Sequence, residues 1–441
     1  MRTKRSHWEE PVSPGKLIGT INSLLSTKEI IIRRKTFIHS SFSQAAPLKS
    51  LPSCRGNSER SDFYMLVLKD GEIYTPEEVI KGNILIEEGQ IKEIGDCPIP
   101  KGAEVIDLEG KIVAPGFIDI HTHGLYGHDS MDGQSAIEEI SAHLPRFGVI
   151  GFLPTAVASP HQKLLVFLKD VREAKRKGAK ILGAHLESPY ISMEKRGAQP
   201  PDSIRPVDMR EVEELIEAGV KMVTIAPEVE GALQAIKRLK EAGVIVSLGH
   251  TNATWEEALQ GINAGISKAT HLFSAMPPIH HRKPGCVGLA LVDERVSCEV
   301  IADFIHLHPI TVKLIIKAKG KDKVILITDS APYAGLPDGE YKWVDGRIIV
   351  KKEGRISFKE EPDVLAGSAL TLDQAVRNVA SLGFPLKDVL QMATLNPARE
   401  AGLEKMGRIR VGENADLVVL DRFLQVQITI INGEIAYKRL D

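Results

Sequence analysis

Side chains of the type that bind metal ions follow the apolar runs of this 441-residue chain at regular intervals. The first run, GFIDIHTHG, carries His121 and His123, and the alternation of a strand points both imidazoles to the same side. Later runs end on one further histidine or carboxylate each, and these are Glu187, His250, His271, His306 and Asp329. Any one of these histidines alone is explained as a hydrogen-bonded core residue. Their recurrence at six strand ends indicates one shared site.

Imidazole and carboxylate groups together are suitable ligands for Zn²⁺, Fe²⁺, Mn²⁺ or Co²⁺. Such an ion lowers the pKa of a bound water toward about 7 and polarises a carbonyl group. A carboxylate beside that water can take its proton and later pass it to a leaving amine, and Asp329 is our candidate for this role. The four cysteines form no C-x-x-C pair, which excludes a thiolate zinc site and indicates a reducing compartment. We therefore expect a cytoplasmic protein.

Between about residues 114 and 400, eight apolar runs alternate with stretches of helical periodicity. The runs are GFIDIHTHG, GVIGFLPTA, KILGAHLES, KMVTIAPE, VIVSLGHT, KATHLFSA, SCEVIADFIH and KVILITDS. Near-continuous apolar runs are typical of strands buried on both faces, so the pattern predicts an α/β fold with a (β/α)8 TIM-type barrel. A doubly wound open sheet is the alternative. It would need a phosphate loop of the form G-x-G-x-x-G after the first run, and GLYGHDSMDG does not have that form.

The two ends of the chain differ from this central part. Short alternating strands with tight turns occupy residues 63–113 and 401–441, and we expect them to pair into a small β-sandwich domain beside the barrel of residues 114–400. Residues 1–62 hold eleven Lys and Arg against five Asp and Glu. We interpret them as a basic extension that is disordered or not translated, with Met65 as the candidate start of the chain.

Charge and hydropathy exclude two classes of partner. The chain has 56 Lys and Arg against 58 Asp and Glu, for a formal charge of -2, so no pull toward nucleic acid is expected. Its mean hydropathy is -0.07, and no apolar run approaches eighteen residues. We therefore expect no binding to nucleic acid and no membrane span.

At these residues the chain resembles the amidohydrolase superfamily and, within it, the N-acetylglucosamine-6-phosphate deacetylases. The resemblance begins near Met65 and runs to the C-terminus. It is carried, in the family order, by PGFIDIHTHG, AHLESPY, KRGAQP, TIAPE, GHTNAT, THLFSAM, HHRKPG, ADFIHLHP, ITDS and LAGSALTL. It implies metal-dependent hydrolysis of the acetamido group of N-acetylglucosamine 6-phosphate, which yields glucosamine 6-phosphate and acetate.

The resemblance also implies the metal ligands. Glu187, His250 and His271 would hold the principal ion, and His121 and His123 would hold a second. We therefore expect two divalent ions in each subunit, either Zn²⁺ or Fe²⁺.

The same resemblance assigns the remaining site residues. Asp329 would be the general base and acid, and His306 would bind the substrate near its acetamido carbonyl. The other residues expected to bind the phosphorylated amino sugar are Gln199, Ser274, Ala275, His281 and Arg282. In the family the residue at Arg282 reaches the phosphate of a neighbouring subunit, so a homodimer is expected.

Three positions depart from the family pattern. Ser188 replaces the glycine of E-G-P, Ser274 replaces the asparagine of H-L-[YF]-N-A-M, and Phe304 replaces the glycine of D-G-[IV]-H. The metal ligands are all kept, so the departures put the identity of the sugar in question. Phe304, two residues before His306 on the expected strand, would face the same side and narrow the pocket unless the backbone shifts.

The alternatives that stay open are other chemistries on the same barrel. The N-acetylgalactosamine 6-phosphate epimer and a different amide are both compatible with the ligands. A cyclic amide hydrolase or deaminase is disfavoured, because the fourth run, KMVTIAPE, ends without the inward lysine that such relatives use. A catalytically inactive scaffold is disfavoured because all candidate ligands are present. We interpret His128 and Asp129, after the first run, as solvated loop residues.

Overall fold

The computed structural model describes residues 64–440, and these residues belong to one compact unit. The predicted basic extension, residues 1–62, lies outside the described residues. Within the described residues, none of the helices combines the length and the hydropathy needed to span a bilayer.

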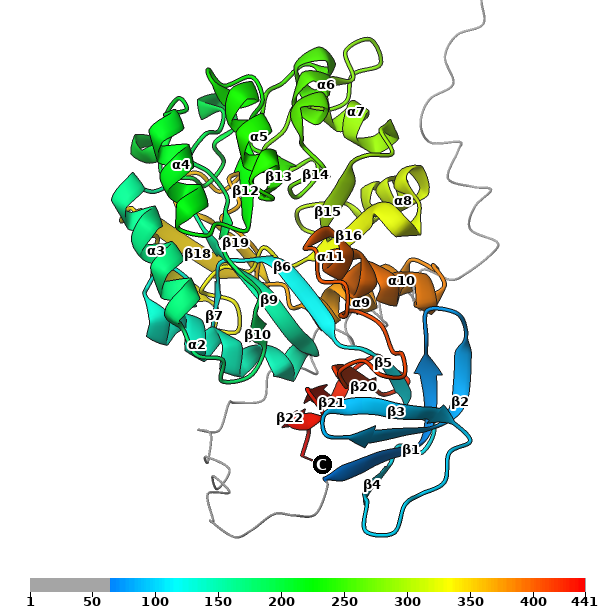
Figure 1. Ribbon diagram of the computed structural model, residues 1–441. Coiled ribbons are helices and arrows are strands. Elements are labelled where there is room, and N and C mark those ends of the chain that lie inside the picture. The colour runs from blue at the N-terminus through cyan, green and yellow to red at the C-terminus, as the bar shows by residue number, and fades with distance from the viewer. Residues whose placement is uncertain (1–63, 441) are drawn as a thin grey trace, which may run out of the picture. The chain divides into compact units, whose positions relative to one another are not determined.

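The centre of this unit is a barrel of parallel strands surrounded by helices (Figure 1). Its strands are β6 (Phe117–Thr122), β9 (Val149–Ala156), β10 (Lys180–Ile181), β11 (His185–Leu186), β12 (Met222–Ile225), β13 (Ile245–Leu248), β14 (Lys268–Ala269), β15 (Ser297–Ile301) and β16 (Val324–Ile327). Both β10 and β11 pair with β9, so they are two halves of one strand position, interrupted at Gly183 with a φ of 123°.

The barrel is nearly closed between its first and last strands. Thr122 and Ser330 form a parallel bridge, and the amide of Asp329 donates a hydrogen bond of 2.9 Å to the carbonyl of His121. This arrangement agrees with the predicted (β/α)8 barrel. The alternative prediction, an open doubly wound sheet, is wrong.

The helices form because their apolar residues recur at helical spacing. In α5, for example, Ala232, Ala235, Ile236 and Leu239 are buried against the barrel. The start of α6 is fixed by a capping box between Thr254 and Glu257. The helices are α2 (Gln134–His143), α3 (His161–Glu173), α4 (Met209–Glu217), α5 (Ala232–Glu241), α6 (Trp255–Ala264), α7 (Gly285–Val292), α8 (Pro309–Lys319), α9 (Leu372–Ser381), α10 (Leu386–Ala393) and α11 (Leu395–Glu400).

Strands from both ends of the chain join one mixed sheet with its own apolar core. They are β1 (Met65–Tyr74), β2 (Val79–Glu87), β3 (Gln90–Gly95), β4 (Glu104–Asp107), β5 (Ile112–Pro115), β20 (Leu417–Leu420), β21 (Val426–Ile431) and β22 (Glu434–Lys438). The two ends meet where β5 runs antiparallel to β20, with Val113 opposite Val419. Seven of these strands follow one hydrogen-bonded path, and β4 branches off it by pairing in parallel with β1. The predicted β-sandwich with its boundaries stays a prediction.

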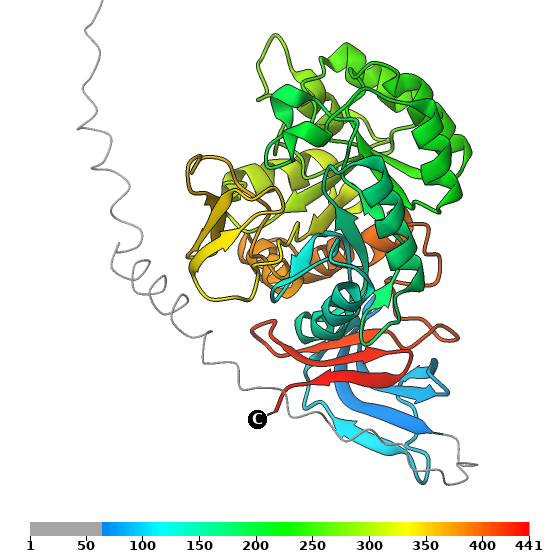
Figure 2. The ribbon, with the colours of Figure 1, turned by 90° about the vertical axis from the view of Figure 1, so that its left-hand side faces the viewer.

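The sequence analysis did not predict a three-stranded antiparallel sheet inserted after β16, which projects from the barrel in Figure 2. Its strands are β17 (Gly339–Lys342), β18 (Ile348–Lys352) and β19 (Arg355–Phe358). Trp343, Ile349 and Phe358 give this insertion a small apolar core. A short hairpin of β7 (Gly124–Leu125) and β8 (His128–Asp129) follows β6.

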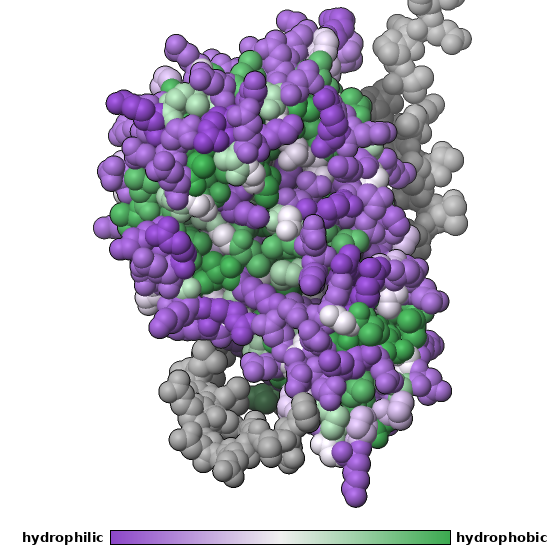
Figure 3. All heavy atoms as spheres, in the orientation of Figure 1, coloured by the Kyte–Doolittle hydropathy of each residue, from purple (hydrophilic) through white to green (hydrophobic). Residues whose placement is uncertain are grey.

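The surface is mostly hydrophilic on the face drawn in Figure 3, as expected for a globular chain of this composition. On that face, hydrophobic side chains gather over the turn between β1 and β2. Val79, at the start of β2, is among the exposed large hydrophobic residues.

Candidate active site

The barrel brings the predicted metal-binding side chains to one place, at the carboxyl ends of its strands. His121 and His123 lie at the end of β6, and Glu187 directly follows β11. Three more residues each lie two positions after a strand, and these are His250 after β13, His271 after β14 and Asp329 after β16. All six side chains are buried.

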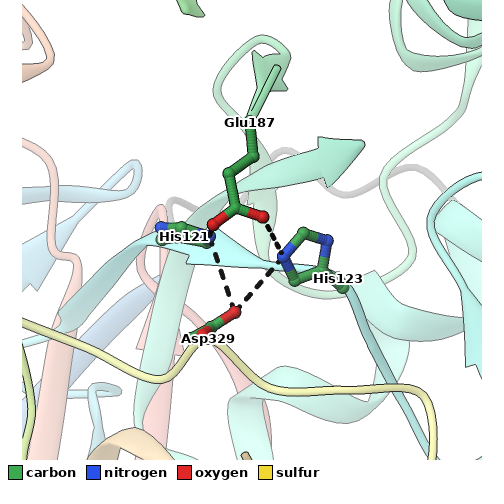
Figure 4. Close-up of side chains that lie close together, drawn as sticks. All are labelled: His121, His123, Glu187 and Asp329. Atoms are coloured by element: carbon green, nitrogen blue, oxygen red, sulfur yellow. Dashed lines mark ion pairs between the residues drawn. The ribbon is translucent and has the colours of Figure 1, made fainter. Parts of the chain in front are cut away.

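Four of these residues form the first ligand set, shown in Figure 4. His121 Nε2 lies 3.4 Å from Glu187 Oε1 and 3.5 Å from Asp329 Oδ1. His123 Nε2 lies 3.1 Å from Glu187 Oε2 and 3.2 Å from Asp329 Oδ1. Two imidazoles therefore face two carboxylates.

Glu187 also belongs to a second ligand set, with His250 and His271. Its Oε1 atom lies 3.1 Å from His250 Nε2 and 2.7 Å from His271 Nε2. The Nε2 atoms of these two histidines are 3.1 Å apart. The two sets thus share one carboxylate, that of Glu187.

The hydrogen bonds of the imidazoles fit a bound cation. Nδ1 of His123 contacts the carbonyl of Thr155 at 3.1 Å, and Nδ1 of His250 contacts the carbonyl of Lys195 at 2.9 Å. Because a carbonyl only accepts, Nδ1 carries the hydrogen in both rings and Nε2 of a neutral ring points its lone pair at Glu187. The lone pair of Nε2 and the carboxylate repel each other, and a cation between them removes this repulsion. Two ligands about 2.1 Å from one tetrahedral ion lie about 3.4 Å apart, close to most separations seen here.

The six buried side chains of the two ligand sets together form what we call the cage. Its electrostatics keep the Glu187 and Asp329 carboxylates ionised. Burial alone would raise the pKa of Glu187, but His121 and His250 hold it well below its usual value. Burial also opposes ionisation of Asp329, yet His121 and His123 lower its pKa. Burial would lower the pKa of His123, and its contacts with Asp329 and Glu187 instead raise it to about 9. Without an ion, ionised carboxylates therefore face a protonated His123, and a bound cation would take the place of that proton.

Three of the six clustered metal-ligand candidates adopt left-handed backbone conformations. The φ angles are 48° at His250, 27° at His271 and 49° at Asp329. For residues other than glycine each such conformation costs about 1–3 kcal/mol, and it is typical of functional sites. Here it turns the chain immediately after a strand, so that the side chain lies over the barrel axis.

A buried ion pair lies beneath the cage and was missed by the sequence analysis. Lys268 Nζ is 3.2 Å from Glu299 Oε1, and Glu299 Oε2 is 3.2 Å from His121 Nδ1. The Lys268 and Glu299 side chains are fully buried. Glu299 thereby orients the His121 ring so that Nε2 faces the cage. The signal was present in the sequence, because both charged residues interrupt otherwise apolar runs.

This pair gives a testable prediction. The Lys268→Met substitution leaves the Glu299 carboxylate buried without its cation, so the free energy of unfolding in urea should fall by about 3–5 kcal/mol. The double variant Lys268→Met/Glu299→Leu removes both charges and should recover most of that stability. Because the double variant lacks the carboxylate that orients His121, it should bind the ion at His121 more weakly. Metal analysis of the folded protein measures this effect. A single variant as stable as wild type would contradict the pairing.

A cavity of about 340 Å³ opens above the cage. The predicted substrate-binding residues that line it are Gln199, Ser274, Ala275 and His306. Gln199 does more than line the cavity, because its Nε2 donates to Glu187 Oε2 at 2.6 Å and its Oε1 accepts from the amide of Ala158 at 2.6 Å. It therefore positions the shared carboxylate.

His306 is held by a residue that the sequence analysis did not name. Its Nδ1 lies 2.7 Å from Asp303 Oδ2, and Asp303 Oδ1 accepts hydrogen bonds from the amides of Ile305 and His306. Burial would lower the pKa of His306, but Asp303 raises it above its ordinary value. The imidazole is therefore a suitable hydrogen-bond donor toward the cavity.

The prediction that Phe304 lies on the same strand face as His306 is wrong. The strand β15 ends at Ile301, so Phe304 does not share a strand face with His306. Phe304 instead adopts a φ of 64°, the left-handed conformation that glycine takes easily, and packs against the main core. Its ring is not part of the cavity wall, so the pocket is not narrowed by it.

The predicted phosphate contacts are not brought into the cavity within one chain. His281 and Arg282 are exposed in the segment before α7, and neither belongs to the cavity lining. Instead, the inserted sheet and the segment after it supply further lining residues, and these are Trp343, Asp363, Val364 and Leu365. Leu365 begins the quoted segment LAGSALTL, but no motif marked the other three, because the insertion interrupts the strand and helix alternation.

Comparisons with known proteins identify the family of this chain. Residues 112–436 match the amidohydrolase family. The chain belongs to the amidohydrolase family. An N-acetylglucosamine-6-phosphate deacetylase of Bacillus subtilis is 38% identical over 387 residues, which are 84% of this chain and 97% of that protein. An N-acetylgalactosamine-6-phosphate deacetylase of Escherichia coli is 36% identical over 360 residues, which are 80% of this chain and 93% of that protein.

Solved structures of amidohydrolase relatives show the same fold. The N-acetylglucosamine-6-phosphate deacetylase of Thermotoga maritima is 34% identical with a TM-score of 0.77, covering 85% of this chain and 100% of that one. A mutant N-acetyl-D-glucosamine-6-phosphate deacetylase of Mycobacterium smegmatis, in complex with N-acetyl-D-glucosamine-6-phosphate, is 31% identical with a TM-score of 0.79. The match covers 85% of this chain and 100% of that one. The buried His, Glu and Asp clusters of this chain fit the metal dependence of the amidohydrolase family.

Proposed function

We propose that this chain removes the acetyl group of N-acetylglucosamine 6-phosphate by metal-dependent hydrolysis. The observation that carries the proposal is the pair of ligand sets that share Glu187 and open onto a cavity of about 340 Å³. A cavity of that size suits a single sugar phosphate. The likeness to deacetylases of the same substrate class, at 36–38% identity, supports the choice of amide.

The proposed site residues follow from the geometry. Glu187, His250 and His271 would hold one ion, and His121 and His123 would hold a second beside Asp329. Zn²⁺ and Fe²⁺ both suit these nitrogen and oxygen ligands. When bound, such ions supply hydroxide at neutral pH and polarise the acetamido carbonyl.

The protein's own groups move the proton and hold the substrate. Asp329, ionised by its histidine neighbours, accepts a proton from the attacking water and returns it to the leaving amine. His306 donates a hydrogen bond to the acetamido group, with its ring held by Asp303. Ser274 and Ala275 line the cavity, where the Ser274 side chain and the backbone amide of Ala275 would contact the sugar.

We further propose that the enzyme is a cytoplasmic homodimer. Arg282 is exposed and is not among the residues that line its own cavity, which suits a phosphate contact in the neighbouring subunit. Arg282→Ala should raise the KM for the phosphorylated sugar about 10- to 100-fold, because a charge-assisted hydrogen bond contributes about 1.5–3 kcal/mol. Steady-state acetate release measures this effect. An unchanged KM would remove Arg282 from phosphate binding.

The proposed function is tested by acetate release with three substrates compared at equal concentration. These are N-acetylglucosamine 6-phosphate, N-acetylgalactosamine 6-phosphate and unphosphorylated N-acetylglucosamine. Preference for the first supports the proposal and shows that Ser188 and Ser274 are tolerated. Activity on neither phosphosugar by metal-loaded protein would overturn it and point to a different amide.

The galactosamine epimer is the second candidate. The relative from Escherichia coli that is named for that epimer is almost as similar as the relative from Bacillus subtilis. Ser274, in place of the family asparagine, lies in the cavity wall where the sugar ring would contact it. A higher kcat/KM for the galactosamine epimer would select this second function.

A further inference from the structure

Three further side chains of ligand type meet outside the active site, where the β7–β8 hairpin packs against α2. They are His128 in β8 and Glu139 and His143 in α2, and one ligand atom of each lies within 4.8 Å of the others. Glu139 and His143 are four residues apart, so they share one face of the helix. All three side chains are half-buried, not fully solvated as the sequence analysis interpreted His128.

We propose that these three residues form an auxiliary binding site for a divalent ion of the zinc class. Two imidazoles with one carboxylate are an established ligand set for Zn²⁺, and water fills the remaining position. The His128 and His143 rings lie side by side, with centroids 6.3 Å apart and planes inclined by 23°. The Tyr126 ring packs against His143 at 4.9 Å and limits its rotation.

A lysine now occupies part of this site. Lys177 Nζ lies 2.7 Å from Glu139 Oε1 and 3.5 Å from Glu138 Oε2. Lys177 is exposed and Glu139 is only half-buried, and ion pairs this open to solvent contribute little stability. An incoming ion can therefore displace the lysine from Glu139, and Glu138 stays available to hold it.

Occupancy of the auxiliary site would act on the neighbouring active site through the chain. The hairpin begins at Gly124, directly after His123, and His128 lies at its second strand. An ion bound by His128 and α2 would tie this hairpin to the outer helix. We therefore expect the ion to raise the melting temperature of protein that already carries its catalytic ions.

The test is a Zn²⁺ titration of catalytically loaded protein, followed by calorimetry and by metal analysis after dialysis. Wild type should bind one ion per chain beyond the active-site complement. His143→Gln and His128→Gln, on two different elements, should each lose that ion. His161→Gln is the matched control, because His161 also lies beside carboxylates, with Nε2 2.7 Å from Glu214. It should bind as wild type does.

A variant that binds the extra ion more tightly would distinguish this site from non-specific binding of ions to the surface. Lys177→Gln frees Glu139 from its competitor, so the extra ion should bind up to about fivefold more tightly. Equal extra binding by wild type and both histidine variants would overturn the proposal, as would the absence of an extra ion in wild type. Because the readout is metal stoichiometry, the result does not depend on the identity of the sugar substrate.

Discussion

The Asp329→Asn enzyme is expected to hydrolyse N-acetylglucosamine 6-phosphate about 10²- to 10⁴-fold more slowly than wild type, because general acid–base catalysis contributes that much. The amide cannot accept a proton from the attacking water. Its oxygen still suits the position of Asp329 Oδ1, which lies 3.2 Å from His123 Nε2. The loss should therefore appear in kcat, measured by acetate release, with the principal ion still bound.

The matched control for this prediction is Asp363→Asn. Asp363 also lines the cavity, but it belongs to neither ligand set. Its variant should keep kcat within about tenfold of wild type, since it takes no part in the proton transfer. Unchanged turnover by the Asp329 variant, or an equal loss in both variants, would remove Asp329 from its proposed role.

Removal of the metal is expected to abolish acetate release altogether. Without a cation, Nε2 of His123 and of His250 faces carboxylates in a buried cage. Asp329 remains as the base, but nothing lowers the pKa of the attacking water or polarises the acetamido carbonyl. The metal-free protein should also lose about 3–4 kcal/mol of stability relative to protein at 100 to 1,000 times the dissociation constant. Activity after chelation and thermal unfolding measure the two effects.

Restoring the metal distinguishes loss of the ion from irreversible damage to the protein during chelation. Added Zn²⁺ or Fe²⁺ should return activity to chelated wild type. It should not return activity to Glu187→Gln protein, because Glu187 belongs to both ligand sets. Full activity of metal-free wild type would contradict a metal-dependent reaction.

The sequence predicted the cage well because its signal is local. Each ligand ends an apolar run, and parallel strands of a barrel bring such ends together without any knowledge of the loops. His250, His271 and Asp329 illustrate this, since each lies two residues after its strand.

What the sequence did not predict depends on packing between distant segments. The Lys268–Glu299 pair and the Asp303–His306 contact are visible only when neighbouring strands and turns are placed. Phe304 was assigned to a strand because its run is apolar, yet the chain turns after Ile301 and no periodicity marks that turn.

Anomalous diffraction at the zinc edge, from crystals of Asp329→Asn protein soaked in N-acetylglucosamine 6-phosphate, locates the catalytic ion and the substrate in one experiment. We predict an anomalous peak among Glu187, His250 and His271, with the uncleaved sugar in the cavity beside Ser274 and His306. A cage without an anomalous peak, or a sugar bound away from this cavity, would contradict this prediction.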